Sequence, residues 1–358
     1  MTIKDLNDII SKFVSGGECD RYGNGHINDT YLTLPMQNIL QRINTDVFKN
    51  PDELMENILG VTEFLREKIV KSGGNPERET LSVVKTLDGN SYYKNENGDC
   101  YRMYKFIDGS KTVDCNPTPE ELCNAAKAFG KFQKMLNDYP AHKLHETIVD
   151  FHNTPDRFKK LKEAIENNLA GRRDSVQAEI DFALSCESWI SKVTDGLADG
   201  SIPLRVTHND TKINNVLFDA QSGEAICVID LDTVMPGSLL YDFGDALRIG
   251  AATADEDETD LSKVEFDLNM FESFTKGFFE EMKDCLTKRE TELLAFSAKL
   301  LTYECGIRFL TDYLNGDTYF KIHREHHNLD RARTQFKLVA DMEKKAEQME
   351  AIVKKYAL

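Results

Sequence analysis

Short runs that alternate hydrophobic and polar residues occupy the first third of the chain and predict an antiparallel sheet. The dipeptides Asp88-Gly89 and Asn97-Gly98 separate the later runs, and both tolerate the positive φ angles of tight hairpins. Residues 51–71 interrupt the series with apolar side chains at helical spacing. The predicted strands lie within residues 31–34, 38–43, 81–87, 91–95 and 100–107. Residues 18–107 are therefore predicted to form a sheet with one inserted helix, after an amphipathic N-terminal helix.

From about Pro117 the pattern changes to the three- and four-residue spacing of amphipathic helices. These helices are predicted at Glu120–Leu136, Ala178–Val193, Lys288–Asn315 and Leu329–Val353. Three short β-branched runs at residues 204–208, 215–219 and 225–231 form an exception. The predicted fold class is α+β, with a small antiparallel β lobe containing one helix and a large, mainly helical lobe. The lobes are expected at residues 1–107 and 108–358.

Charge and composition narrow the classes of partner. The 358 residues include 61 acidic and 44 basic side chains, which gives a formal net charge of −17. A basic surface for nucleic acid or an anionic membrane is therefore not expected. The excess acid is compatible with an anionic ligand such as ATP, because a divalent metal and backbone N–H groups can hold phosphates.

Cysteine use and the N-terminal sequence bear on the compartment. The eight cysteines include no C-x-x-C pair, and several lie in apolar runs, as reduced buried thiols do. Charged residues interrupt the first helix, so it does not resemble a signal peptide. No apolar run reaches the length of a membrane span. We expect a cytoplasmic protein with no membrane partner.

The stretch from His208 to Asn215 carries the strongest chemical signal, because it fits the pattern H-x-D-x-x-x-x-N. Phosphoryl transfer to a hydroxyl explains these residue types: Asp210 takes or orients the proton of the nucleophile, Asn215 offers a neutral oxygen to Mg²⁺, and His208 braces the loop. The alternative is a carboxylate that caps a turn between two strands. Short motifs of this kind also occur by chance.

An apolar strand that ends in two carboxylates, Asp230 and Asp232, follows this loop. Alternation along a strand would point both side chains the same way. Such carboxylates are costly beside an apolar strand unless a cation or another partner compensates them. A divalent metal bridged to phosphate would do so. The alternative is a cap or turn at the strand end.

The tripeptide Asp242-Phe243-Gly244 matches the metal-binding motif of protein kinases. No strand-like run leads into it, and it lies too far from Asp210 for a hairpin to connect the two. We therefore predict that Asp230 binds the metal, and that Asp242 or Asp245 braces the backbone of the catalytic loop.

Two further motifs are weaker. The turn at residues 22–31 contains glycines that would expose backbone N–H groups to phosphates, although many ordinary hairpins look alike. No G-K-[ST] sequence follows, so it is not a Walker loop. The histidines at 323, 326 and 327 lack the H-E-x-x-H order of zinc sites, and a solvated segment is predicted there.

Together, the H-x-D-x-x-x-x-N loop, the I-D-L-D strand and the two-lobed pattern resemble the aminoglycoside phosphotransferase and choline kinase family. The segments "DLDTVMPGSL" and "ECGIRFL" resemble the sugar 1-kinases of that family, and the similarity spans about residues 18–345. The resemblance implies a protein-kinase-like fold, ATP and Mg²⁺ as cofactors, and phosphorylation of the anomeric C1 hydroxyl of N-acetylglucosamine or N-acetylgalactosamine. It leaves open a kinase of another small alcohol (an aminoglycoside, choline, homoserine or another hexose) and a non-catalytic nucleotide-binding module. A monomer or weak homodimer is expected.

The resemblance also implies a role for each matched residue. Asp210 matches the catalytic base, with His208 as its support and the acceptor hydroxyl in contact. Asn215 and Asp230 match the Mg²⁺ ligands. The other matches are the phosphate-covering turn with Gly23, Asn24, Gly25 and Asn28, the interlobe hinge where the backbone of Lys105 and Ile107 would meet adenine, and the acceptor contacts His26, Asp232 and Arg308.

One position departs from the family. Its members carry a phosphate-binding lysine on the third strand, whereas this strand reads "ILQRIN". Either Gln41 or Arg42 would occupy the place of the lysine, and the sequence does not fix the register. The partner glutamate on the following helix, Glu53 or Glu56, is equally open.

Overall fold

The computed structural model describes residues 3–23, 28–35, 37–113 and 116–358 of the chain. Its internal contacts form two compact units, and both are discontinuous in sequence. The first unit comprises Met1–Thr112, Asp138–Val149 and Val216–Pro236, and the second Val113–Asn137, Asp150–Asn215 and Gly237–Leu358. The predicted division at residues 107 and 108 stays a prediction.

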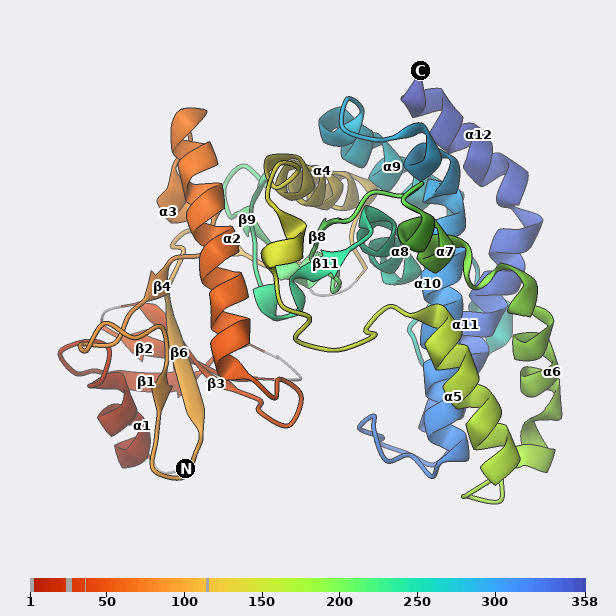
Figure 1. Cartoon of the computed structure of the whole chain (residues 1–358), viewed down its shortest axis with the longest axis horizontal. Helices are drawn as coiled ribbons and strands as arrows, with labels where there is room; N and C mark the ends of the chain where they lie inside the picture. Colours follow the sequence, from red (N-terminus) through yellow and green to blue (C-terminus); the bar gives the residue numbers. More distant parts are fainter. Residues whose placement is uncertain (1–2, 24–27, 36, 114–115) are drawn as a thin grey trace. The chain divides into compact units, whose positions relative to one another are not determined.

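An antiparallel sheet forms the body of the first unit (Figure 1). Its strands follow the order β1-β2-β3-β6-β4, and β5 also pairs with β6. The strands are β1 (Glu18–Arg21), β2 (Asp29–Leu34), β3 (Asn38–Ile43), β4 (Val83–Val84), β5 (Tyr93–Lys94) and β6 (Cys100–Lys105). The predicted antiparallel sheet is therefore confirmed, and Gly89 and Gly98 have the positive φ angles expected of the intervening turns.

The two faces of this sheet differ in character. The short helix α1 (Ile3–Ile10) and the residues after it cover one face with a hydrophobic cluster. Its buried members are Leu6, Ile9, Ile10, Phe13, Leu40, Tyr101 and Met103. Because side chains alternate along a strand, Gln41 and Arg102, which are direct partners in the β3–β6 pairing, face the opposite side.

Helix α2 (Pro51–Lys71) has the bounds that its apolar spacing predicts, with Asn50 as N-cap and Pro51 in the first turn. The buried side chain of Asn57 donates to the carbonyl oxygens of His145 and Val234, at 2.8 and 3.0 Å. These bonds tie the two later segments of the chain to the first unit. The unit also contains α3 (Pro76–Glu79) and the sheet β10-β9-β7, with strands Ser110–Lys111 (β7), Val216–Asp219 (β9) and Ala225–Val228 (β10). Its last segment ends at Pro236, within β11 (Met235–Gly237).

The second unit is mainly helical, and α10 packs against α5, α8 and α11 (Figure 1). Its elements are α4 (Pro119–Met135), α5 (Thr154–Asn167), α6 (Gln177–Ser185), α7 (Lys192–Asp199), β8 (Arg205–Thr207), α8 (Leu239–Gly250), α9 (Leu268–Met282), α10 (Lys288–Leu314), α11 (His327–Lys344) and α12 (Ala346–Ala357). Capping boxes at Thr118 and Thr287 explain where α4 and α10 begin.

Two of the predicted helices are wrong in length. A 3₁₀ turn at Glu187–Trp189 divides the predicted helix Ala178–Val193 into α6 and α7. The predicted helix Leu329–Val353 is likewise two helices, α11 and α12, which are separated at Lys345. Hydrophobic spacing continues across both breaks because the successive helices bury their apolar faces in the same unit.

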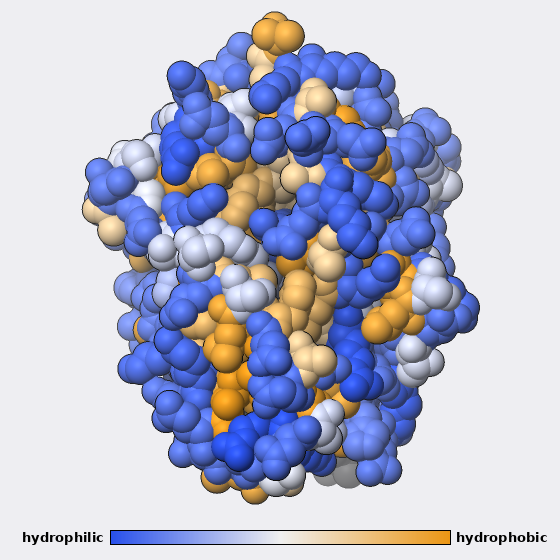
Figure 2. Space-filling view, turned by 90° about the vertical axis from the view of Figure 1, so that its right-hand side faces the viewer, coloured by the Kyte–Doolittle hydropathy of each residue, from blue (hydrophilic) through white to orange (hydrophobic). Residues whose placement is uncertain are grey.

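One face of the molecule is mostly hydrophilic (Figure 2). Hydrophobic residues on this face occupy narrow patches between polar side chains. Within the described part of the chain, no helix combines the length and the hydrophobicity that a membrane crossing requires.

Helices α8 and α10 approach each other closely at Gly244. A methyl group at this position would overlap the backbone oxygen of Ser297 on α10. The crossing distance therefore depends on the absence of a side chain at residue 244. This matters for the site described below, because Gly244 lies between two carboxylates of α8.

We expect Gly244→Ala to lower the free energy of unfolding by about 1–3 kcal/mol, because backbone must move to admit the methyl group. Gly60→Ala on α2 is the control, since its methyl group would meet only the end of the Tyr139 side chain. Alanine also has the higher helix propensity, so the control is expected to be neutral or stabilising. Urea denaturation measures both, and equal stabilities would contradict the close approach.

Candidate active site

The H-x-D-x-x-x-x-N motif forms the loop between β8 and the 3₁₀ turn Ile213–Asn215. His208, Asn209 and Thr211 are buried, whereas the side chain of Asp210 is half-buried. The ring nitrogen Nδ1 of His208 accepts the backbone N–H of Asp210 at 3.3 Å. Asp210 is therefore a partly accessible carboxylate whose immediate neighbours in the loop, Asn209 and Thr211, are buried.

The carboxylate of Asp242, in the first turn of α8, supports this loop through hydrogen bonds to its backbone. It accepts the backbone N–H groups of His208 and Asn209, at 2.9 and 2.7 Å, and also the side-chain amide of Gln133. The Thr211 hydroxyl donates to the backbone oxygen of Asp242 at 2.6 Å. Burial raises the pKa of Asp242 against the opposing effect of these donors.

Asp245, one turn later on α8, accepts the backbone N–H of Thr211 at 3.1 Å and pairs with Arg248 at 3.2 Å. Burial opposes its charge, but Arg248 and His152 outweigh burial and lower the pKa of Asp245. The predicted bracing role is confirmed for Asp242 and Asp245 alike. The kinase-like tripeptide Asp242-Phe243-Gly244 is part of a helix and supports the loop.

A second support reaches the loop from α10. The buried His152 ring contacts Glu304 through Nδ1 at 2.8 Å and the backbone oxygen of Asn209 through Nε2 at 3.2 Å. Thr154 also donates to Glu304, at 2.6 Å. Asn209 has a φ of 65°, which is left-handed, so this bond fixes an unusual backbone conformation beside Asp210. No local sequence pattern indicates this pair, because its members are 152 residues apart.

Asn215 faces the carboxylate of Asp210. Its Nδ2 donates to the backbone oxygen and to Oδ2 of Asp210, at 2.8 and 3.1 Å. Neither bond uses Oδ1, so Asn215 retains a neutral oxygen of the kind that Mg²⁺ binds. Among the described residues, no group of three or more His, Cys, Asp or Glu side chains has the arrangement of a metal site. Each of the two predicted ligands, the amide oxygen of Asn215 and the carboxylate of Asp230, is of a chemical type that Mg²⁺ accepts, because this ion binds oxygen ligands and keeps several waters.

In the first unit, Asp230 and Asp232 follow β10, but the strand ends at Val228. Asp230 has a left-handed φ of 58°, and Asp232 lies in the 3₁₀ turn Leu231–Thr233. The prediction that both extend a strand with alternating side chains is therefore wrong, because the left-handed residue ends the extended backbone. The predicted metal and acceptor roles of the two aspartates stay predictions.

The structure resolves the register of the third strand. Arg42 lies on the α1 face, where its guanidinium contacts Asp99 at 2.5 Å. Gln41 lies on the opposite face, where Oε1 accepts two N–H groups of Arg102, at 3.0 and 2.9 Å. Gln41 shares the face of Arg102 but is neutral, and Arg42 is a cation but lies on the other face. Glu56 of α2 contacts His145 at 2.7 Å.

The remaining nucleotide-binding candidates lie at the two ends of the sheet. Gly23 has a positive φ of 72°, and Asn28 is buried at the other end of the β1–β2 turn. Asn24, Gly25 and His26 fall outside the described residues. Lys105 ends β6, its side chain contacts Glu77 at 2.9 Å, and Ile107 is buried two residues later.

Arg308 on α10 lies one turn beyond Glu304. Its guanidinium stacks with the rings of Phe151 and Phe320, 5.9 and 5.5 Å from the ring centres. No ion pair or hydrogen bond of Arg308 occurs within the described chain. Burial, and then the charge of Arg308, lower the pKa of the neighbouring Arg157. This region of the second unit is therefore locally rich in positive charge, in a chain that is acidic overall.

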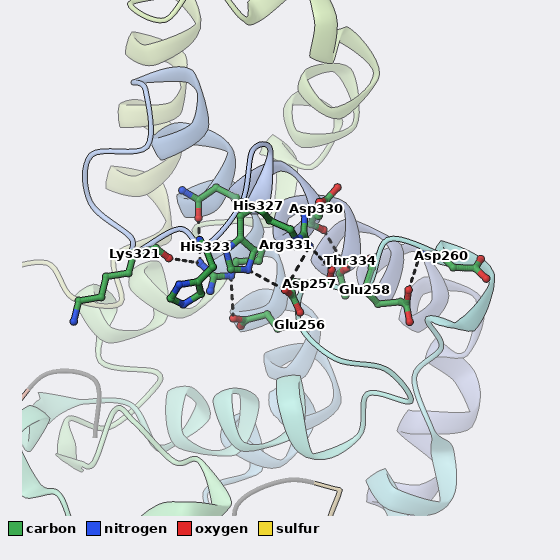
Figure 3. Close-up of polar contacts among 12 residues, drawn as sticks. Glu256, Asp257, Glu258, Asp260, Lys321, His323, His327, Asp330, Arg331 and Thr334 are labelled. Carbon is green, nitrogen blue, oxygen red and sulfur yellow. Dashed lines mark hydrogen bonds and ion pairs between the residues drawn. The ribbon is translucent and has the colours of Figure 1, made fainter. Parts of the chain in front are cut away.

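The histidine-rich stretch is a structural contact (Figure 3). His327 is buried and contacts Asp257 at 2.9 Å, and Arg324 binds the same loop. The prediction of a solvated segment holds for His323 and His326, which are exposed, and is wrong for His327. These bonds anchor the start of α11 to the loop after α8.

Residues 19–270 match the phosphotransferase enzyme family, abbreviated APH. The chain belongs to this family. Solved structures of similar fold include a microcompartment-associated aminopropanol kinase, with a TM-score of 0.68, 14% identity and coverage of 98% of this chain and 99% of that one. The similarity to known phosphotransferases was therefore correctly predicted at the level of the family.

Two further phosphotransferases were solved with ligands. A spectinomycin phosphotransferase in complex with ADP and spectinomycin has a TM-score of 0.59 and 12% identity, and the match covers 97% of this chain and 99% of that one. An amicoumacin kinase with AMP-PNP and Ca²⁺ has a TM-score of 0.56 and 13% identity, with coverage of 91% and 88%. These likenesses confirm the predicted protein-kinase-like α+β fold, with an antiparallel N-terminal sheet and a helical C-terminal lobe.

The His152–Glu304 pair predicts a dependence of stability on pH. Glu304 and Asp245 raise the pKa of His152 despite its burial, so the stabilisation is complete below the unfolded value of about 6.5 and is lost as pH rises through the folded value. His152 in turn lowers the pKa of Glu304, whose contribution is lost only as pH falls through that lowered value. We expect the free energy of unfolding of the wild type to exceed that of His152→Gln by at least about 2 kcal/mol near pH 6. This difference is expected to shrink towards pH 9.

Urea denaturation at several pH values measures this difference. His145→Gln is the control, because His145 is exposed and pairs with Glu56 at the surface. A difference that stays constant from pH 6 to pH 9 would show that the charge of His152 is not involved.

Proposed function

We propose that this chain is an ATP- and Mg²⁺-dependent kinase of N-acetylhexosamines that produces the sugar 1-phosphate. The observation that carries the kinase assignment is the loop in which Asp210 is the one carboxylate and is partly accessible, while Asp242, Asp245 and His152 hold the backbone around it. Such rigid placement of one carboxylate is what a catalytic base requires. The phosphotransferase relatives with bound ADP or AMP-PNP support ATP as the phosphoryl donor.

In the proposed reaction, the C1 hydroxyl oxygen of the sugar attacks the γ-phosphorus of ATP in line. Asp210 takes the hydroxyl proton as the new P–O bond forms, and the bond to the bridging oxygen breaks to release ADP. An anomeric hydroxyl is more acidic than an ordinary alcohol, so a carboxylate is an adequate base. The amide of Asn215, bound to Oδ2 of Asp210 at 3.1 Å, orients the carboxylate for this transfer.

Asn215 and Asp230 are the proposed Mg²⁺ ligands. When bound, the ion neutralises charge on the phosphates of the nucleotide. The chain would contribute a neutral amide oxygen and one carboxylate, and other ligands would come from water and the nucleotide. The backbone of Gly23, Asn28, Lys105 and Ile107 is proposed to meet the nucleotide.

The acceptor region supports a neutral sugar. Arg308, held between two aromatic rings, offers guanidinium donors to hydroxyl or carbonyl oxygens, and Arg157 adds a second positive charge nearby. Two such cations disfavour an acceptor that is itself cationic, such as an aminoglycoside, choline or aminopropanol. The aminopropanol kinase and the spectinomycin phosphotransferase share this fold, so the choice of acceptor has to be tested directly. Asp232 carries less of this proposal, since both of its carboxylate oxygens have partners.

We expect Asp210→Asn to lower kcat by about 10²–10⁴ while ADP affinity stays within about twofold, because only the proton acceptor is removed. Asp195→Asn on α7 is the matched control, since this exposed carboxylate only contacts Ser191. Steady-state rates and calorimetric titration with ADP measure both effects. An Asp210→Asn enzyme within a few-fold of the wild type would exclude Asp210 as the base.

The acceptor is tested with a panel of N-acetylglucosamine, N-acetylgalactosamine, galactose, choline, homoserine, 1-amino-2-propanol and kanamycin. ATP consumption identifies the acceptor, and phosphorus NMR of the product shows whether the phosphate is on the anomeric carbon. We expect turnover with the N-acetylhexosamines and a C1 phosphate. Turnover confined to the amines would replace the sugar assignment with an amino-alcohol kinase. If none of these acceptors stimulates ATP consumption, the sugar assignment is refuted.

A further inference from the structure

The first unit encloses a charged side chain that the motifs do not reveal. Arg102 on β6 has an exposed fraction of 1%, and it is the largest of the fully buried side chains. Its Nη1 lies 2.5 Å from Oδ1 of Asp232, and its other N–H groups donate to Oε1 of Gln41. A buried charge is costly without a partner, so Arg102 and Asp232 depend on each other.

The position of Arg102 relates it to the lysine that the third strand lacks. Gln41 and Arg102 are paired directly across β3 and β6, so their side chains lie on the same face of the sheet. On that face β3 contributes a neutral amide, and the cation comes from β6. Burial by itself disfavours this cation, but Asp232 and its neighbours raise the pKa of Arg102 above the ordinary value.

Asp232 connects three parts of the first unit. Its Oδ2 accepts the Nδ2 amide of Asn28 at 2.7 Å, and its backbone oxygen accepts the Thr147 hydroxyl at 3.4 Å. Asn28 closes the glycine-bearing turn, and its own Oδ1 accepts the backbone N–H of Asn44 at 3.0 Å. Arg102 therefore holds, through one carboxylate, the end of the glycine turn and the turn that contains Asp230.

We infer that Arg102 is a positioning residue for the Mg²⁺-bound nucleotide, acting through Asp232 on the metal ligand Asp230 and on the glycine turn. The inference rests on the proposed function. Arg102 is too deeply buried to bind phosphate itself, so its role differs from that of a phosphate-binding lysine. On this face, β3 offers no cation that could contact phosphate directly. The affinity for the nucleotide then depends on how well the metal ligand Asp230 is held.

The arrangement makes a specific prediction about affinity. Residues that orient metal ligands typically change metal affinity by about 10–100-fold when they are replaced. We therefore expect Arg102→Lys to weaken binding of ADP in the presence of Mg²⁺ by at least about tenfold, since lysine cannot reproduce the fork that reaches both Asp232 and Gln41. Binding of ADP without Mg²⁺ is expected to stay within about twofold.

A double variant, Arg102→Leu with Asp232→Leu, separates positioning from stability. Replacement of a whole buried ion pair by apolar residues is often neutral or stabilising, whereas loss of one partner is not. We expect this variant to fold, as judged by circular dichroism and urea denaturation, and still to lose the Mg²⁺-dependent part of ADP affinity. Arg66→Lys on α2 is the control for the same chemical change at a surface pair in the same unit.

Isothermal titration of the full-length chain with ADP, with and without Mg²⁺, decides between the outcomes. A loss confined to the Mg²⁺ titration in both Arg102 variants supports the inference. A folded double variant that binds Mg²⁺-ADP within twofold of the wild type overturns it and leaves the proposed function intact. A wild type that binds no ADP under either condition instead overturns the proposed function, and the inference with it.

Discussion

Buried carboxylates that accept backbone N–H groups hold the loop around Asp210 in shape, and the rest of the proposed site in the second unit depends on this constraint. The loop around Asp210 has no strand partner for its N–H groups, and an unpaired buried N–H group is costly. Asp242 and Asp245 accept three of these groups from one face of α8. Gly244 lies between them and allows α8 to approach α10 closely. The crossing of these two helices therefore helps to set the position of the carboxylates that bind the loop.

The distribution of charge separates support from chemistry. Three buried pairs, Asp245–Arg248, Glu304–His152 and Asp232–Arg102, are internally compensated and rigid. In contrast, no ion pair within the described chain involves Asp210 or Arg308. Charges that are matched inside the protein stabilise an arrangement, and charges left unmatched are available to a ligand. This division gives the proposed base and the proposed acceptor contact a common physical basis.

In the first unit, the buried cation on the Gln41 face of the sheet comes from β6. Direct pairing across β3 and β6 places Gln41 and Arg102 side by side, so a cation on either strand reaches the same face. Here the cation is on β6 and is enclosed by Asp232. The chain thus combines a neutral side chain, Gln41, on this face of the third strand with a buried ion pair that holds the turn of the proposed metal ligand Asp230.

The sequence by itself determined the features that depend on residues close together in the chain. Helical spacing predicted the bounds of α2, and Asn97-Gly98 predicted the hairpin turn between β5 and β6, because each signal acts within a few residues. Asp88-Gly89 also forms a turn, but β4 and β5, on either side of it, do not pair with each other. Only the tertiary structure decided which side chains support the loop around Asp210 and the turn that contains Asp230. His152 with Glu304, and Arg102 with Asp232, are far apart in the chain, and a pairing between distant residues leaves no periodic trace. The left-handed conformation of Asp230 is likewise fixed by its surroundings, so no strand pattern could foresee it.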